Sequence, residues 1–79
     1  MEYEIITTNI FDEWFAELKD IRSKARIITR FDRVRMGNLG DYKNIGGGLY
    51  EMRFFFGPGF RIYFTIKENR IVILLCGGD

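Results

Sequence analysis

The chain has 79 residues, which is room for one domain, and 47% of them are hydrophobic and 16% aromatic. This composition is sufficient for a packed core and argues against intrinsic disorder. One cysteine excludes an internal disulfide, and the lack of histidine excludes a His/Cys metal site, so we expect no metal and no cofactor. No apolar run approaches the ~20 residues of a membrane span, and the first residues are acidic. We therefore expect a cytoplasmic protein with no membrane partner.

The first half of the chain predicts a strand and two helices. Residues 2–7 are typical of a short strand, after which Thr7, Thr8 or Asn9 is placed to cap a helix. The apolar stripe of that helix has helical spacing and comprises Phe11, Trp14, Phe15, Leu18 and Ile21. A second helix is expected over residues 22–36, and Gly37-Asn38 ends it. Its predicted core face comprises Ile21, Ala25, Ile27, Ile28, Phe31 and Val34.

Charge is unevenly distributed although the net charge is only +1. Residues 1–18 carry five acidic side chains and no basic one, whereas residues 19–35 carry seven basic side chains and two acidic ones. On the second helix, the side opposite the apolar face is predicted to be a narrow basic stripe of Arg22, Arg26, Arg30 and Arg33. Such a stripe favours a polyanion or an acidic protein as partner, but an ordinary solvated helix face has the same pattern.

After Gly40 the pattern changes to a period of two, which predicts strands. In residues 49–55 and 60–66 the even positions are apolar and should face the core, and Gly57-Pro58-Gly59 must turn between them. A tight turn at Glu68-Asn69 leads to a last strand over 70–76, apolar on both faces and therefore expected inside the sheet. Its outward residues, away from the helices, should be Val72, Leu74 and Cys76.

These elements predict an α+β domain over residues 1–79 with the order β-α-α-β-β-β-β. The helical hairpin should cover one face of a mainly antiparallel sheet. The open face then carries Glu51, Arg53, Arg61, Tyr63 and Thr65, provided that the loop between the two strands has an odd number of residues. Arginine forks bind phosphate and tyrosine stacks on bases or donates a proton, which suits RNA or DNA. Charged residues on the wet face of any sheet would give the same pattern.

Several segments resemble the RelE/ParE superfamily of toxins. The resemblance covers Asp20–Ile27, Arg30–Arg33, Gly37–Asp41, Leu49–Arg53, Gly57–Phe64 and Leu74–Asp79, in family order and spacing. The chain is most similar to the small "addiction module killer protein" branch, related to RelE and HigB toxins. The resemblance implies a RelE-like fold and the toxin of a type II toxin–antitoxin pair. RelE-like members enter the ribosome and cut mRNA by attack of the ribose 2′-OH.

The same resemblance implies roles for individual residues. Arg61 matches the arginine that stabilises the phosphate, and Arg53 stands at the second lysine of a catalytic pair. Glu51 stands at the first of that pair, which reverses the charge, and Tyr63 completes the expected catalytic set. The residues expected to bind RNA are Arg22, Arg26, Arg30, Arg33 and Lys43.

Family members continue beyond Gly-Gly-Asp with a C-terminal helix, whereas this sequence stops at Asp79. We therefore expect reduced activity and an uncovered apolar last strand, which favours self-association or binding to an antitoxin. The expected partners are a small helix-turn-helix antitoxin, the ribosome and mRNA. Two other functions remain open: a ParE-like toxin that binds DNA gyrase without catalysis, and an inactive domain that only binds its antitoxin.

Overall fold

The computed structural model describes residues 2–57 and 59–77. Along them the elements are β1 (Glu4–Thr7), α1 (Asn9–Glu17), α2 (Ile21–Arg35), β2 (Tyr42–Gly46), β3 (Leu49–Arg53), β4 (Arg61–Lys67) and β5 (Arg70–Gly77). The predicted α+β class and the order of elements along the chain are confirmed. The first strand is shorter than predicted, and each end of α2 lies one residue before its predicted position.

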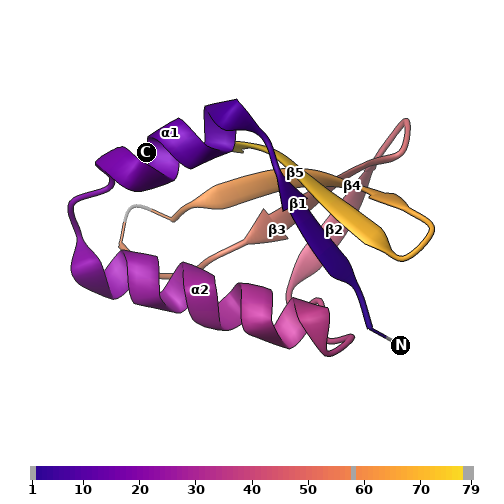
Figure 1. Cartoon of the computed structure of the whole chain (residues 1–79), viewed down its shortest axis with the longest axis horizontal. Helices are drawn as coiled ribbons and strands as arrows, with labels where there is room; N and C mark the ends of the chain where they lie inside the picture. Colours follow the sequence, from indigo (N-terminus) through magenta and orange to yellow (C-terminus); the bar gives the residue numbers. More distant parts are fainter. Residues whose placement is uncertain (1, 58, 78–79) are drawn as a thin grey trace.

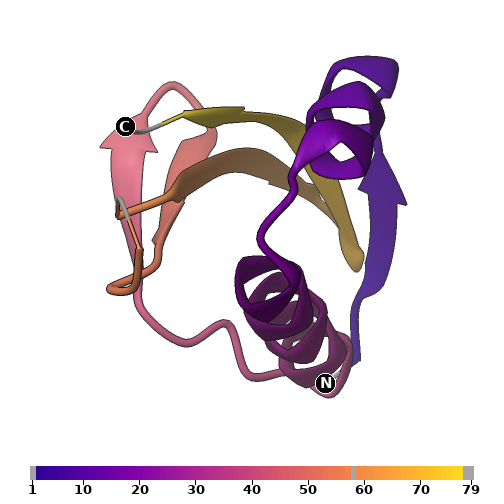
Figure 2. The ribbon, with the colours of Figure 1, turned by 90° about the vertical axis from the view of Figure 1, so that its left-hand side faces the viewer.

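The strands of the described chain form a five-stranded mixed sheet in the order β1-β5-β4-β3-β2 (Figure 1). Strand β1 pairs with β5 in parallel, and the other neighbouring strands pair in antiparallel fashion. Figure 2 shows the sheet curving around α2, with both helices on its concave side. The prediction that helices cover one face of the sheet is therefore confirmed. The prediction that the last strand lies inside the sheet is also confirmed, because β5 lies between β1 and β4.

Helix α1 begins at the cap that the sequence offered. The backbone N–H of Phe11 donates to Thr8 Oγ1 at 3.3 Å, and the Thr8 hydroxyl donates to the carbonyl of Leu74 at 2.6 Å. The cap therefore also joins the start of α1 to β5. The helix ends at Glu17, so Ile21 belongs to α2 and is exposed. Its predicted place on the α1 stripe is wrong because the helical phase does not continue across the 18–20 connection.

Helix α2 is capped by side chain and backbone at its two ends. Asp20 accepts hydrogen bonds from the Ser23 hydroxyl at 2.9 Å and from the N–H of Arg22 at 3.0 Å, and these bonds lower the pKa of Asp20. At the other end Gly37 has a φ of +99°, and Gly37 and Asn38 donate back to the carbonyls of Val34 and Arg33. This is a Schellman motif, so the predicted stop is confirmed.

The buried face of α2 is narrower than the predicted one. It consists of Ser23, Ile27, Phe31 and Val34, whereas the predicted members Ala25 and Ile28 are exposed. The concave sheet receives a single line of residues three or four apart, and Arg30 lies beside that line. Arg30, predicted to lie in the basic stripe opposite the apolar face, is half-buried, so the alternative of a fully solvated stripe does not hold for it.

The alternation of β3 and β4 is confirmed. Met52, Ile62 and Phe64 are fully buried, and Phe54 and Phe60 extend the same core past the strand ends. Arg53 lies opposite Arg61, so the loop between them comprises residues 54–60 and has the odd length that the pattern required.

Strand β5 departs from the predicted alternation at Leu74. Phe64 pairs with Ile73 and Tyr63 with Leu75, which leaves Leu74 as the extra residue of a β-bulge. Val72 and Leu74 are half-buried. The predicted alternation does not continue unchanged past Leu74, because a bulge reverses the parity of the residues beyond it. The predicted outward direction of the Cys76 side chain lies outside what the structure describes.

Two adjacent isoleucines test this core. Ile27 is completely buried and Ile28 is 50% exposed on the same helix. Ile27→Ala should lower the free energy of unfolding by about 2–5 kcal/mol, because it removes buried surface and leaves a cavity. Ile28→Ala should change it by less than about 1 kcal/mol. Urea denaturation of both variants measures the difference, and equal losses would contradict the placement of α2.

Candidate nucleic-acid interface

The outer face of the sheet brings the predicted catalytic residues together. Arg53 lies directly opposite Arg61, and Glu51 lies directly opposite Tyr63. On β2, the other neighbour of β3 in the sheet, Lys43 lies opposite Glu51. Opposed residues of an antiparallel pair share a face with their Cβ atoms about 4.5–5.5 Å apart. The structure therefore gathers Glu51, Arg53, Arg61 and Tyr63 with one of the predicted RNA-binding residues, Lys43, into a single outer cluster.

Carboxylates accompany both arginines of the outer cluster. Arg53 Nη2 lies 3.2 Å from Asp41 Oδ1, and Arg61 Nε lies 4.0 Å from Glu51 Oε2. Nε of Arg53 is buried and has no hydrogen-bond partner among the described residues. Asp41 was not predicted as a site residue. Its only sequence signal is its position just before β2, which brings it level with Arg53 once the strands pair.

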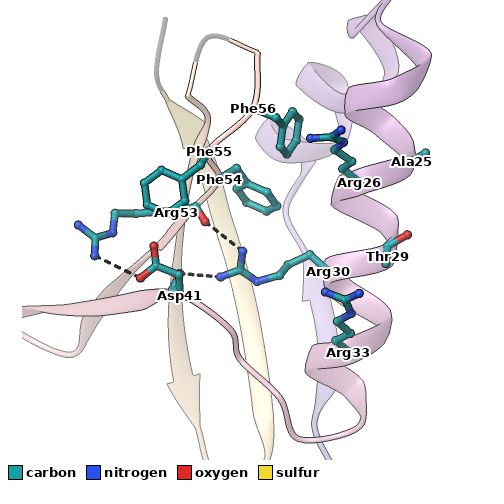
Figure 3. A pocket seen from close by; sticks show the side chains of 10 residues that line it. All are labelled: Ala25, Arg26, Thr29, Arg30, Arg33, Asp41, Arg53, Phe54, Phe55 and Phe56. Atoms are coloured by element: carbon teal, nitrogen blue, oxygen red, sulfur yellow. Dashed lines mark hydrogen bonds and ion pairs between the residues drawn. The ribbon is translucent and has the colours of Figure 1, made fainter.

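Arg30 makes the densest set of polar contacts near this face. Its guanidinium donates to the carbonyls of Leu39 at 3.1 Å, Asp41 at 2.5 Å and Arg53 at 3.0 Å, and it lies over the Phe54 ring at 4.9 Å (Figure 3). Burial lowers the pKa of Arg30, although it stays charged at any physiological pH because the ordinary value is so high. These bonds tie α2 to the loop before β2 and to the end of β3.

Gly40 makes room for this arrangement. Its φ is +70°, and a Cβ atom placed there would lie 2.5 Å from Arg30 Nε. Only glycine combines that backbone conformation with such a close approach. The Arg30 guanidinium therefore holds the loop between α2 and β2 through its hydrogen bonds, and it fits there because Gly40 has no side chain.

A groove of about 350 Å³ lies between α2 and the segment that follows β3. Arg26, Arg30 and Arg33 line it from α2, and Arg53 and residues 54–56 line it from the other side (Figure 3). A second hollow of about 250 Å³ includes Arg61 and shares Arg53 and Phe55 with the groove. The predicted stripe and the predicted open face are therefore joined through Arg53, whereas Arg22 does not line either hollow.

Phe55 was not among the predicted site residues, yet 82% of it is exposed. A signal for it was available. Three consecutive phenylalanines occupy residues 54–56, and in a period-two segment the middle one must point away from the core. Phe56 is half-buried, and the Arg26 guanidinium lies 5.0 Å from its ring centroid.

Two other kinds of site find no support in residues 2–57 and 59–77. No helix there is both long and apolar enough to span a membrane. Nor do three or more His, Cys, Asp or Glu side chains of that part come close enough together to hold a metal ion. The candidate site thus consists of arginine, lysine, tyrosine, phenylalanine and carboxylate groups.

Comparison with known proteins gives one relationship over the full length of the chain. An uncharacterized protein of Haemophilus influenzae is 44% identical over 79 residues, which is 100% of this chain and 80% of that protein. No family model matches the chain.

The structural role of Arg30 can be separated from its charge. Arg30→Lys keeps the charge but cannot reach three carbonyls, and unsatisfied buried acceptors should lower the free energy of unfolding by about 1–3 kcal/mol. Arg33→Lys is the matched control, because Arg33 lies on the same helix and its side chain makes no hydrogen bond or ion pair within the described residues. It should change stability by less than about 0.5 kcal/mol. Thermal denaturation measures both, and equal effects would contradict the role assigned to Arg30.

Proposed function

The chain belongs to the same family as this uncharacterized Haemophilus influenzae protein, and we propose that it is the toxin of a type II toxin–antitoxin module that cleaves mRNA on the ribosome. The resemblance of its motifs to the RelE/ParE superfamily supports this proposal, as does the β-α-α-β-β-β-β order expected of a RelE-like fold. The observation that carries it is the outer cluster, where two arginines, a tyrosine, a carboxylate and a lysine share one sheet face.

Each member of the outer cluster has a chemical part in this proposal. The 2′-oxygen of a ribose attacks the adjacent phosphorus, the new P–O2′ bond forms and the P–O5′ bond breaks. Glu51 accepts the proton from the 2′-OH, and Tyr63 supplies one to the leaving O5′. Arg61 stabilises the negative charge that builds up on the phosphoryl oxygens. Arg53, whose side chain is 39% exposed, binds the phosphate from the neighbouring strand.

The partners follow from the same proposal. A small helix-turn-helix antitoxin neutralises the toxin, and the ribosome presents mRNA to it in the cytoplasm. Self-association through the last strand belongs to the proposal as well. Among the side chains of β5 that the structure describes, the half-buried Val72 and Leu74 support it.

One observation favours a second function, a domain that binds its antitoxin without cutting RNA. Both arginines of the outer cluster have a carboxylate within 4.0 Å, Asp41 for Arg53 and Glu51 for Arg61. Such pairs reduce the positive charge offered to a phosphate. The two functions predict different results when Glu51 is replaced. If Glu51 is the base, its loss stops mRNA cleavage. If the chain cuts no RNA, its loss only removes the carboxylate beside Arg61.

Arg61→Ala tests the proposed function against a closely matched control. Loss of one group that stabilises charge in the transition state should slow mRNA cleavage by about 100- to 1000-fold. Arg70→Ala should leave cleavage unchanged: Arg70 also lies on a strand and pairs with a glutamate, and its side chain is 58% exposed against 57% for Arg61. Primer extension on mRNA from a ribosome-containing translation extract measures cleavage.

The outcomes separate the candidate functions. Glu51→Gln should abolish cleavage if Glu51 is the base. No cleavage by the wild-type chain, together with tight binding of its antitoxin, would support the binding domain instead. Inhibition of DNA supercoiling by gyrase without any mRNA cleavage would overturn both in favour of a gyrase-binding toxin.

A further inference from the structure

We propose that the groove between α2 and residues 54–56 is a binding site for single-stranded RNA, in which a base stacks on Phe55 and phosphates bind Arg26 and Arg33. The identity of the ligand as RNA rests on the proposed function. The site itself is additional to the outer cluster, because none of these three residues takes part in the chemistry described above.

Phe55 supplies the stacking surface. Phe55 has 82% of its surface in water and contributes little to the core, so its ring is available to stack on a ligand. It lines both the groove and the second hollow, and therefore stands between Arg61 and the arginines of α2. A chain that passes from the outer cluster into the groove can therefore contact its ring.

Arg26 and Arg33 supply the positive charge. Neither forms an ion pair within the described residues, in contrast to Arg53 and Arg61. The Arg26 guanidinium lies over the Phe56 ring at 5.0 Å, which holds its plane toward the groove (Figure 3). Asp41 is the acidic residue in the lining, and its carboxylate is already paired with Arg53. The groove therefore presents a net positive surface, with two guanidinium groups that form no ion pair within the described residues.

The groove is also held in a fixed shape. The hydrogen bond from Arg30 to the Arg53 carbonyl joins α2 to the end of β3, which are the two walls, and its bonds to the carbonyls of Leu39 and Asp41 hold the loop before β2 beside them. Phe54 packs in the core directly before Phe55, and its ring meets Phe56 at 5.6 Å. A ligand thus meets walls that need little ordering, which lowers the entropic cost of binding.

Single-stranded RNA fits this surface better than an acidic peptide or a duplex. Aromatic faces interleaved with arginines are the usual elements of single-strand recognition, because every base has a face that can stack. An acidic peptide would use the guanidiniums but has no need of an exposed ring. A duplex keeps its bases stacked inside and would leave Phe55 without a partner.

The test measures RNA binding by the full chain without ribosomes. The probe is a fluorescent single-stranded RNA of eight nucleotides, followed by anisotropy, with the same sequence as a duplex and an oligoglutamate peptide as comparisons. Phe55→Leu should weaken single-strand binding by about 5- to 100-fold, the range of one lost stacking contact. Because Phe55 is exposed, its replacement leaves the core unchanged, and a thermal melt of each variant checks this.

The arginines are tested by salt dependence. Arg26→Gln/Arg33→Gln should lower the slope of log K against log salt by about 1.4, at ~0.7 for each single-strand phosphate contact. Arg35→Gln is the matched control on the same helix, because Arg35 lies outside the groove and pairs with Asp32, and it should leave the slope unchanged. A slope unchanged in the double variant, or equal binding of the peptide with no effect of Phe55→Leu, would overturn the inference.

Failure of this inference and failure of the proposed function give different results. If the wild-type chain cleaves mRNA in extract while Phe55→Leu and the double arginine variant bind the probe normally, the groove is not the RNA site. If those variants lose binding but the wild-type chain cleaves nothing, the groove inference stands and the proposed catalysis does not.

Discussion

The guanidinium of Arg30 is the contact on which the arrangement of this molecule depends most. It joins three backbone carbonyls, those of Leu39 and Asp41 before β2 and that of Arg53 at the end of β3. Helix α2 would otherwise meet this side of the sheet through apolar contacts alone, which are not directional. A charged donor with hydrogen bonds at fixed angles sets the distance between helix and strand, and so sets the width of the groove and the position of Asp41 beside Arg53.

The sequence predicted the outer cluster better than it predicted the helix. Parity decides which face of a strand a residue occupies, so Glu51, Arg53, Arg61 and Tyr63 could be assigned to one face from alternation once the loop between the two strands was taken to have an odd length. The bulge at Leu74 was not predictable in the same way, because the extra residue is visible only when β5 is paired with β4. Local pattern is sufficient where it repeats, and fails where the partner strand interrupts it.

Arg30 shows a different limit. On a helical wheel it falls among the other arginines of α2, and its charge suggests exposure. What buries it is a set of carbonyl groups from segments 9 to 23 residues away, and no pattern within the helix reports their position. The space left by Gly40 is part of the same arrangement. Of the four arginines predicted to share one role, Arg30 acts within the fold, Arg26 and Arg33 line the groove, and Arg22 lies apart from it.

Arg53 connects the structural and the functional parts of the site in a particular way. Its carbonyl accepts from Arg30, while its side chain reaches the outer face and pairs with Asp41. The backbone atom belongs to any residue at this position, so the chain can change the side chain without losing the anchor of α2. The reverse does not hold, because loss of the Arg30 guanidinium removes the bonds to both Asp41 and Arg53. The side chain at residue 53 on the outer face can therefore change while the hydrogen bond between the Arg30 guanidinium and the backbone carbonyl of that residue is kept.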